Sequence, residues 1–261
     1  MAGGRAGNVV QLRDVTSLRD KVSDEEWEAR VNLAALYRLV EINGWNSGIY
    51  NHASMRVPGE PGNFLIKAHP LLWREVTASN LVKVAMTGEL DESAGVNRPG
   101  FVLHSAIQRA RPDVGAVLHI HPNVCIAVSV MKDGLIPLSQ QSAFLQGQVG
   151  YHEYNGITED ADERDRIIAA LGEKRALLMR SHGATTVGET PRHAYITMYH
   201  LIDACEIQLK VMASGAELVA PSDEIIRKTA KQEAAHQKGR GQDDWPAMLR
   251  LLDEVAPGYR E

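Results

Sequence analysis

The sequence predicts a single α/β domain with a trailing helical arm, and three observations support this fold class. Segments with the apolar pattern of strands alternate with segments of helical periodicity. No long linker, repeat or low-complexity run separates them. The chain has 261 residues, enough to bury well over half of its unfolded surface in a core. Neither a disulfide nor a metal is therefore needed merely to hold the fold together.

The N-terminal half is predicted to contain one long helix and several short strands. Residues 1–22 are rich in glycine and polar residues, which indicates a loose N-terminal arm. Ser23 and Glu26 form a capping-box pattern that opens a helix with apolar residues at helical spacing, ended by Gly44. The elements expected next are strands at 49–57, 64–66 and 82–86, a helix at 100–110 and a strand at 114–121.

The C-terminal half continues the alternation. It is expected to hold a helix at about 122–132, a helical turn between 138 and 147, a helix at 161–171 and a buried strand at 176–180. Thr190 as N-cap and Pro191 in the first turn begin a long helix that reaches about Gly215. Two further helices follow, near 222–236 and 243–255. We therefore expect a domain over residues 23–215 and a helical arm over residues 216–261.

Composition excludes several classes of protein. The formal net charge is -5 and the sequence pI is about 6.1, which argues against a nucleic-acid partner because such proteins usually carry a basic patch. No apolar run is long enough for a membrane-spanning helix, and no secretory signal is expected at the N-terminus. Cys125 and Cys205 stand in apolar surroundings and are typical of buried thiols in a cytoplasmic protein. The chain has 10 histidines, more than folding requires.

Histidines at 119, 121 and 182 are the sharpest chemical feature. Side chains alternate along a strand, so His119 and His121 lie on one face at the end of the 114–121 strand. His182 follows a second buried strand. Three histidine ligands leave a first-row metal with open coordination positions, as in catalytic rather than structural sites. The spacing alone leaves open that these are only hydrogen-bonded histidines at strand ends.

Five short segments, in their order and separations, resemble the class II aldolase/adducin family from Glu26 to Leu209. They are residues 50–56 (Tyr-Asn-His-Ala-Ser-Met-Arg), 101–104 (Phe-Val-Leu-His), 111–114 (Arg-Pro-Asp-Val), 119–122 (His-Ile-His-Pro) and 181–183 (Ser-His-Gly). The resemblance implies a three-layer α/β/α sandwich around a largely antiparallel sheet, and a homo-tetramer with active sites at subunit interfaces. It also implies one divalent metal per chain, zinc, iron, manganese or cobalt, held by His119, His121 and His182.

The departures from this family are equally informative. Its aldolases carry Pro-Ser-Ser-Glu just before the helix that holds His104, and here residues 97–100 read Asn-Arg-Pro-Gly. Gly100 replaces the acid/base glutamate and cannot transfer a proton. A Thr-Gly pair of the phosphate loop is replaced by His69 and Pro70. A phosphate cradle needs free backbone N–H groups, and proline has none. An ordinary sugar-phosphate aldolase is therefore not expected.

Three functions remain. The first is a metal-dependent lyase that cleaves a C–C bond, by retro-aldol reaction or decarboxylation, in a small non-phosphorylated oxo or hydroxy carboxylate. The second is a non-haem Fe(II) oxygenase acting on a 2-oxo or 2-hydroxy acid, because open metal positions can also accept O₂. The third is a non-catalytic scaffold, since animal adducin heads resemble the same family. An enzyme is favoured because all three candidate metal ligands are retained. Its expected partners are a small-molecule carboxylate and other copies of the chain, with no membrane.

Further residues are candidates for the catalytic and substrate-binding groups, each with a structural alternative. His104 is either an acid/base or supporting group of the site or a packed helix residue, and Tyr151 is either a proton donor or part of an ordinary turn. Asn51 occupies the position of the family's substrate-loop asparagine, or only stabilises a turn. The remaining substrate-binding candidates, which can equally be surface residues, are Lys67, His69, Arg98 and Gln141.

Overall fold

A seven-stranded sheet forms the centre of the computed structural model, which describes residues 17–90, 92–156, 161–238 and 243–261. The strand order is β3-β2-β1-β4-β7-β6-β5. All neighbouring strands are antiparallel except β5 and β6, which are parallel. The strands are β1 (His52–Val57), β2 (Glu60–Lys67), β3 (Leu81–Ala85), β4 (Ala116–Ile120), β5 (Val149–His152), β6 (Ala176–Met179) and β7 (Gly183–Gly188). The expected, largely antiparallel sheet is confirmed.

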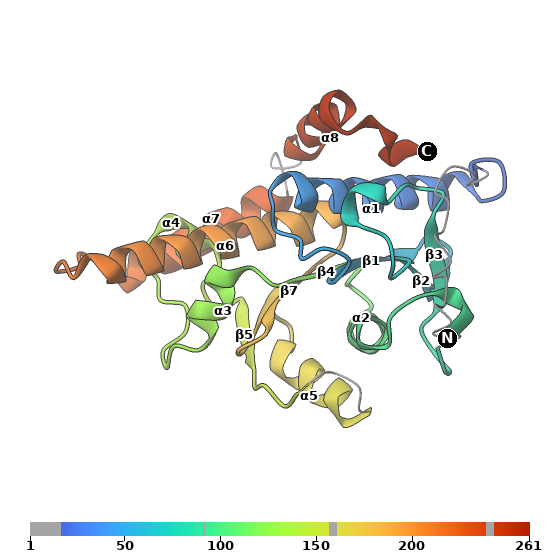
Figure 1. Cartoon of the computed structure of the whole chain (residues 1–261). Coiled ribbons are helices and arrows are strands. Elements are labelled where there is room, and N and C mark those ends of the chain that lie inside the picture. The colour runs from blue at the N-terminus through green and yellow to red at the C-terminus, as the bar shows by residue number, and fades with distance from the viewer. Residues whose placement is uncertain (1–16, 91, 157–160, 239–242) are drawn as a thin grey trace, which may run out of the picture.

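Helices cover both faces of this sheet, which confirms the predicted α/β/α sandwich (Figure 1). One face shares a core with α1, α3, α6 and α8, and the other packs against α2 and α5. Alternation along β4 shows the division, because Leu118 belongs to the first core and Val117 to the second. The helices are α1 (Asp24–Ile42), α2 (Arg98–Ala110), α3 (Asn123–Ser129), α4 (Gln140–Phe144), α5 (Ala161–Leu171), α6 (Pro191–Ser214), α7 (Asp223–Lys238) and α8 (Asp244–Val255).

The last two helices pack on the rest of the chain. Helix α7 lies along α4, and α8 lies against α1, where the indole N–H of Trp245 donates to Asn32 Oδ1 at 2.7 Å. Most of the expected N-terminal arm, residues 1–16, lies outside the described residues. Cys125 and Cys205 are fully buried free thiols, as predicted. None of the helices in the described ranges is long and apolar enough to cross a membrane.

Some local predictions were wrong. Strand β7 was not predicted, because Gly183-Ala-Thr-Thr-Val-Gly188 is short, small-residued and bounded by glycines. Tyr151 and His152 lie in β5 rather than in a turn, since β5 pairs with the buried strand β6. The capping box is only half present: Ser23 Oγ accepts from Glu26 N at 3.1 Å, but the Glu26 carboxylate pairs with Arg30 instead of returning to Ser23. A guanidinium 2.9 Å away attracts the carboxylate more strongly than a backbone amide does.

Candidate metal centre and substrate cavity

Three imidazole rings converge at one end of the sheet. His119 lies in β4, His121 follows it directly, and His182 stands in the loop between β6 and β7. Their ring centroids are 4.5 to 5.0 Å apart, and one ring nitrogen from each lies within 4.8 Å of the others. Nε2 of His119 and Nε2 of His121 are 3.0 Å apart. The rings therefore meet as the sequence predicted.

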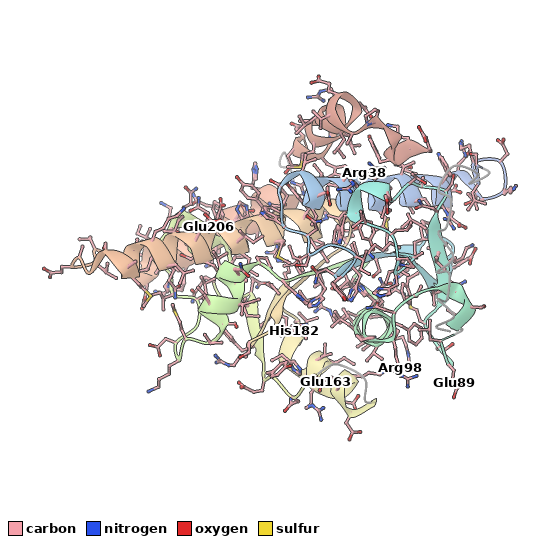
Figure 2. All side chains as sticks on the ribbon, viewed as in Figure 1. Arg38, Glu89, Arg98, Glu163, His182 and Glu206 are labelled. Atoms are coloured by element: carbon pink, nitrogen blue, oxygen red, sulfur yellow. The ribbon has the colours of Figure 1, made fainter. Side chains whose placement is uncertain are left out.

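Strand register explains this convergence. The alternation that places Val117 on the α2 and α5 side of the sheet also directs His119 to that side. Pairing of β4 with β7 sets the Cα atoms of Ile120 and Ala184 opposite each other, which brings the loop holding His182 beside the end of β4. Ser181 adopts a positive φ of 56° in this tight connection. Figure 2 shows His182 on the same side of the sheet as α5.

The hydrogen bonds of His119 place its proton on Nδ1 and leave a lone pair on the nitrogen that faces the cluster. Nδ1 of His119 lies 3.0 Å from Thr185 Oγ1, and the Thr185 hydroxyl donates to the sulfur of Met179. Because the hydroxyl has one hydrogen, its oxygen accepts the proton of His119 Nδ1. The lone pair of His119 is therefore on Nε2, which faces His121.

The donor set fits a first-row divalent metal. Two nitrogens bound to zinc at the usual length are about 3.4 Å apart, and the three rings need only small shifts to reach this separation. Metal ligation requires neutral imidazole. Burial lowers the pKa of His121 to about 4, lowers that of His182, and holds that of His119 well below its ordinary value. These three residues would hold the metal.

A row of hydrogen-bonded polar side chains lies beside the three rings. The ring of His52, on β1, stacks on His119 with centroids 5.2 Å apart, and its Nδ1 lies 2.7 Å from Nε2 of His104. Nδ1 of His104 lies 2.5 Å from Ser54 Oγ, to which Gln108 Nε2 donates at 2.7 Å. Burial lowers the pKa of His104 to about 3 and that of His52 well below its ordinary value, so both rings are neutral.

A cavity of about 460 Å³ opens onto the three-histidine cluster. No lysine or arginine is among its described lining residues, which are Tyr50, Asn51, His52, His69, Asn97, Pro99, Leu103, His119, His121, Tyr154, Gly156, Met179 and His182. Asn51 is only 4% exposed, has a positive φ of 67°, and neither atom of its side-chain amide has a hydrogen-bond partner. An amide left unpaired in a buried cavity is poised to bind a polar ligand.

The structure separates the other predicted site residues into two groups. Asn51 and His69 line the cavity, and His104 stands behind His52. Lys67 is buried elsewhere, with its ammonium donating to the carbonyls of Ile49, His69 and Leu71. The other three candidates do not line the cavity. Tyr151 accepts from the backbone N–H of Leu135, Gln141 is the second residue of α4, and Arg98 is exposed and points outward from α2 (Figure 2).

Among the cavity residues, sequence reasoning gave His52 no role and selected Tyr151 instead of Tyr154 from the cluster after Gly150. His52 was part of a family segment but received no role. Its signal is alternation: His52 and Ser54 are two apart on a strand, and the Cα of His52 pairs with that of His119. Tyr154 lies 6.5 Å from His182 between ring centroids, beyond the end of β5. Nothing in the local pattern distinguishes it from Tyr151, since only the extent of β5 decides which of them faces the cavity.

Comparison with known proteins identifies the family. Residues 31–209 match the family described as Class II Aldolase and Adducin N-terminal domain. The chain belongs to this family. A Caulobacter vibrioides protein named as a class 2 aldolase is 41% identical over 94% of this chain and 96% of its own length. Rat (Rattus norvegicus) alpha-adducin is 38% identical over 99% of this chain, which corresponds to 38% of the adducin.

Solved structures of the family share the fold. An aldolase II superfamily protein from Pseudomonas syringae is 46% identical and superposes with a TM-score of 0.88 over 94% of this chain and all of its own. The L-fuculose 1-phosphate aldolase of Glaciozyma antarctica is 26% identical, with a TM-score of 0.76 over 91% of this chain and 93% of the aldolase. Class II aldolases use a divalent metal, and the three-histidine cluster is the corresponding candidate site here.

Proposed function

We propose that this protein is a metal-dependent lyase that cleaves a C–C bond, by retro-aldol reaction or decarboxylation, in a small non-phosphorylated oxo or hydroxy carboxylate. The observation that carries the proposal is the cluster of His119, His121 and His182 at the wall of a cavity large enough for a small acid. A divalent metal bound there supplies Lewis acidity toward the carboxylate and carbonyl oxygens of such a substrate.

The protein's own groups bind and orient the substrate. The unpaired amide of Asn51 offers N–H donors to a carbonyl or carboxylate oxygen and an acceptor oxygen to a hydroxyl group. Part of the cavity wall is apolar and consists of Leu103, Met179 and Pro99. This wall excludes water and so strengthens each polar contact inside the cavity. Thr185 holds the His119 ring in its orientation through Nδ1.

The charges around the cavity favour a substrate without phosphate. A phosphate dianion is usually held by arginine, lysine or a run of backbone N–H groups. The described lining residues include no arginine or lysine, because Lys67 points at carbonyls and Arg98 faces solvent. His69 precedes a proline, which has no backbone N–H to offer. A carboxylate would need no such cradle, because a metal held by His119, His121 and His182 would supply positive charge at the cavity wall.

The first test is metal content. Protein purified with zinc, manganese, iron(II) or cobalt in excess and then desalted is expected to retain about one divalent ion per chain. His121→Ala should lose it, because two histidines remain where three are needed. His236→Ala, which changes an exposed histidine of α7, is the matched control and should retain the metal. Full metal content in His121→Ala would contradict the proposed site.

The second test is turnover of a panel of 2-oxo and 2-hydroxy acids by the metal-loaded protein. Products of C–C cleavage should form at the same rate with and without oxygen. A strict requirement for O₂ would replace the lyase by an iron oxygenase.

A non-catalytic binding role is the second candidate function, and one observation favours it. Alpha-adducin matches nearly the whole chain at 38% identity, while Gly100 stands where an acid/base glutamate is expected. Retention of metal without turnover of any acid in the panel would support this role over the lyase.

A further inference from the structure

The ring of His52 occupies the space that a side chain at position 100 would need. A Cβ built on Gly100 would lie 2.4 Å from Oδ1 of Asn97, 2.9 Å from Cδ2 of His52 and 3.0 Å from Nε2 of His52, at or below the shortest distances that real Cβ atoms show. The missing side chain of Gly100 therefore leaves room for the imidazole of His52 and for the side-chain amide of Asn97. The two ring atoms next to Gly100, Cδ2 and Nε2, belong to His52, which lines the cavity.

The hydrogen-bonded chain behind His52 has a fixed direction. Gln108 Nε2 donates to Ser54 Oγ at 2.7 Å, while Gln108 Oε1 is buried without a partner, so Ser54 Oγ is an acceptor in this amide orientation. Ser54 is fully buried, and within the described residues its oxygen contacts only Gln108 and His104, so its own hydrogen goes to His104 Nδ1. With Nδ1 accepting, neutral His104 carries its proton on Nε2, which donates to His52 Nδ1 at 2.7 Å.

This row of hydrogen bonds ends at His52 and decides which of its two ring nitrogens carries the proton. Because Nδ1 of His52 accepts, neutral His52 carries its proton on Nε2, the atom beside Gly100 at the cavity wall. We infer that His52 Nε2–H is a permanent hydrogen-bond donor to a substrate oxygen, with Gln108, Ser54 and His104 as positioning residues that fix its tautomer. This inference rests on the proposed function for the identity of the substrate, though not for the direction of the chain.

Two features distinguish this donor from a fourth metal ligand. A nitrogen that carries a proton has no lone pair for a metal. In addition, His52 is not among the residues whose ligand atoms lie within 4.8 Å of one another. Stacking on His119 holds the His52 ring in place, with the ring planes inclined by 28°.

A donor here changes the chemistry expected of the site. A glutamate can remove a proton from a substrate. The Nε2–H group of His52, whose tautomer is fixed by its hydrogen bond with His104, can only donate a hydrogen bond. Such a donor stabilises an oxygen that gains negative charge as the C–C bond breaks, without removing a proton. In decarboxylation of a 2-oxo acid that carries a second carboxylate on the carbon next to its carbonyl, the bond to that second carboxylate breaks and CO₂ leaves. Both electrons of the broken bond stay on the fragment that keeps the 2-oxo acid, as an enolate whose oxygen accepts the His52 hydrogen bond. This favours decarboxylation, which needs no base, over retro-aldol cleavage, which begins with loss of a hydroxyl proton.

Histidine tautomers are the direct test. Nuclear magnetic resonance of zinc-loaded protein with ¹⁵N-labelled histidine distinguishes Nδ1–H from Nε2–H rings. His52 and His104 should both show the Nε2–H form. Ser54→Ala removes the hydroxyl that fixes the chain, so both rings should show mixed tautomers. A His52 ring protonated on Nδ1 would overturn the inference.

Binding of oxalate, a probe that resembles the charged product of a cleaved 2-oxo acid, tests the function of the donor. By isothermal titration of the zinc-loaded protein, His52→Phe should weaken oxalate binding about 10- to 100-fold, since a hydrogen bond to a charged group is lost while an aromatic ring remains. Its zinc content should be unchanged, and His236→Phe should bind oxalate like the unaltered protein. Equal affinity in His52→Phe would refute the donor. If the unaltered protein takes up no metal, the proposed function fails, and the tautomers of the metal-free protein still decide the inference.

Discussion

Gly183 is the residue on which the geometry of the candidate metal centre depends most closely. A Cβ at this position would lie 2.6 Å from Cδ2 of His121 and 2.7 Å from the carbonyl oxygen of Ile120. The absence of a side chain lets the loop that holds His182 approach the end of β4. One methyl group is therefore enough to disturb the cluster without changing any of its nitrogens.

This gives a prediction at the residue scale. Gly183→Ala should raise the dissociation constant for zinc by about 10- to 100-fold, the usual effect of displacing a ligand through its neighbour. Competition with a chromophoric chelator measures it. Gly62→Ala is the matched control, because nothing lies within 4 Å of a Cβ there, and its zinc affinity should not change. Equal affinity in the two variants would show that the loop adjusts freely.

Lys67 illustrates how burial converts a predicted binding residue into a structural one. Its ammonium donates to three backbone carbonyls, and burial lowers its pKa to about 8 from 10.5. Between these two values the unfolded chain binds more protons than the folded chain. The free energy of unfolding should therefore gain a positive slope with pH in this window and none below it.

The prediction is tested by comparing urea unfolding of the unaltered protein with Lys67→Met between about pH 8 and pH 10.5. The variant should be less stable at every pH, because three buried carbonyls lose a donor. It should also lack the added slope, so the two stability curves should diverge as pH rises. Parallel curves would mean that Lys67 titrates normally in the fold.

At the scale of elements, Tyr37 joins α1 to the sheet. Its hydroxyl donates to the carbonyl of Ala53 at 2.5 Å and accepts from the backbone N–H groups of Ala53 and Lys67. The ring is fully buried and packs edge-on against Trp73, with centroids 4.7 Å apart. One side chain thus connects α1 to both β1 and β2, next to the strand that holds His52 and Ser54.

Removal of this hydroxyl should destabilise the whole domain. Tyr37→Phe is expected to cost about 1 to 3 kcal/mol, because buried backbone groups lose their partner. Chemical denaturation followed by tryptophan fluorescence measures the change. Tyr199→Phe, at a tyrosine 39% exposed on α6, should change stability by less than about 0.5 kcal/mol. A similar small effect of Tyr37→Phe would mean that water replaces the hydroxyl.

The strength of the pattern in each element also decided how much of the fold could be predicted from the sequence. The long helix with Pro191 in its first turn and the strand holding His119 have strong periodic signals, and both are present. Strand β7 has no such signal, because its two glycines and its small residues show no alternation of large apolar and polar side chains. The convergence of His182 with His119 and His121 depends on the pairing of β7 with β4, which local sequence does not encode. The positions of the three histidines at strand ends suggested the convergence and left an alternative open, and the resemblance to a family then favoured it.

The same distinction applies to the cavity. Asn51 could be assigned because a family position identified it, whereas the importance of His52 depends on a partner 52 residues away, at His104. Lys67 and Tyr151 have the residue types of binding groups, but burial and backbone partners decide their roles. A single sequence contains residue types and spacing, and hydrogen-bond direction emerges only from tertiary packing.

At the scale of the whole molecule, the end of α6 and the start of α7 project beyond the sheet (Figure 1). Apolar side chains are exposed on this projection. Val219 is 97% exposed and Ile225 is 49% exposed. Large apolar side chains that are exposed in one chain can be covered in an interface with another. We therefore expect the projection to contact another copy of the chain, as in the homo-tetramer that the family resemblance implies.

Light scattering coupled to size-exclusion chromatography tests this expectation. The chain mass is 28.7 kDa, so a tetramer should elute at about 115 kDa. The double variant Val219→Asp and Ile225→Asp should shift the mass toward smaller species, because each buried carboxylate in an apolar interface carries a desolvation penalty. Val255→Asp, at a residue 57% exposed on α8, is the control for added charge and should leave the mass unchanged. A monomer in the unaltered protein would contradict the tetramer that the family resemblance implies, while the three-histidine cluster, built within one chain, would stand independently of that result.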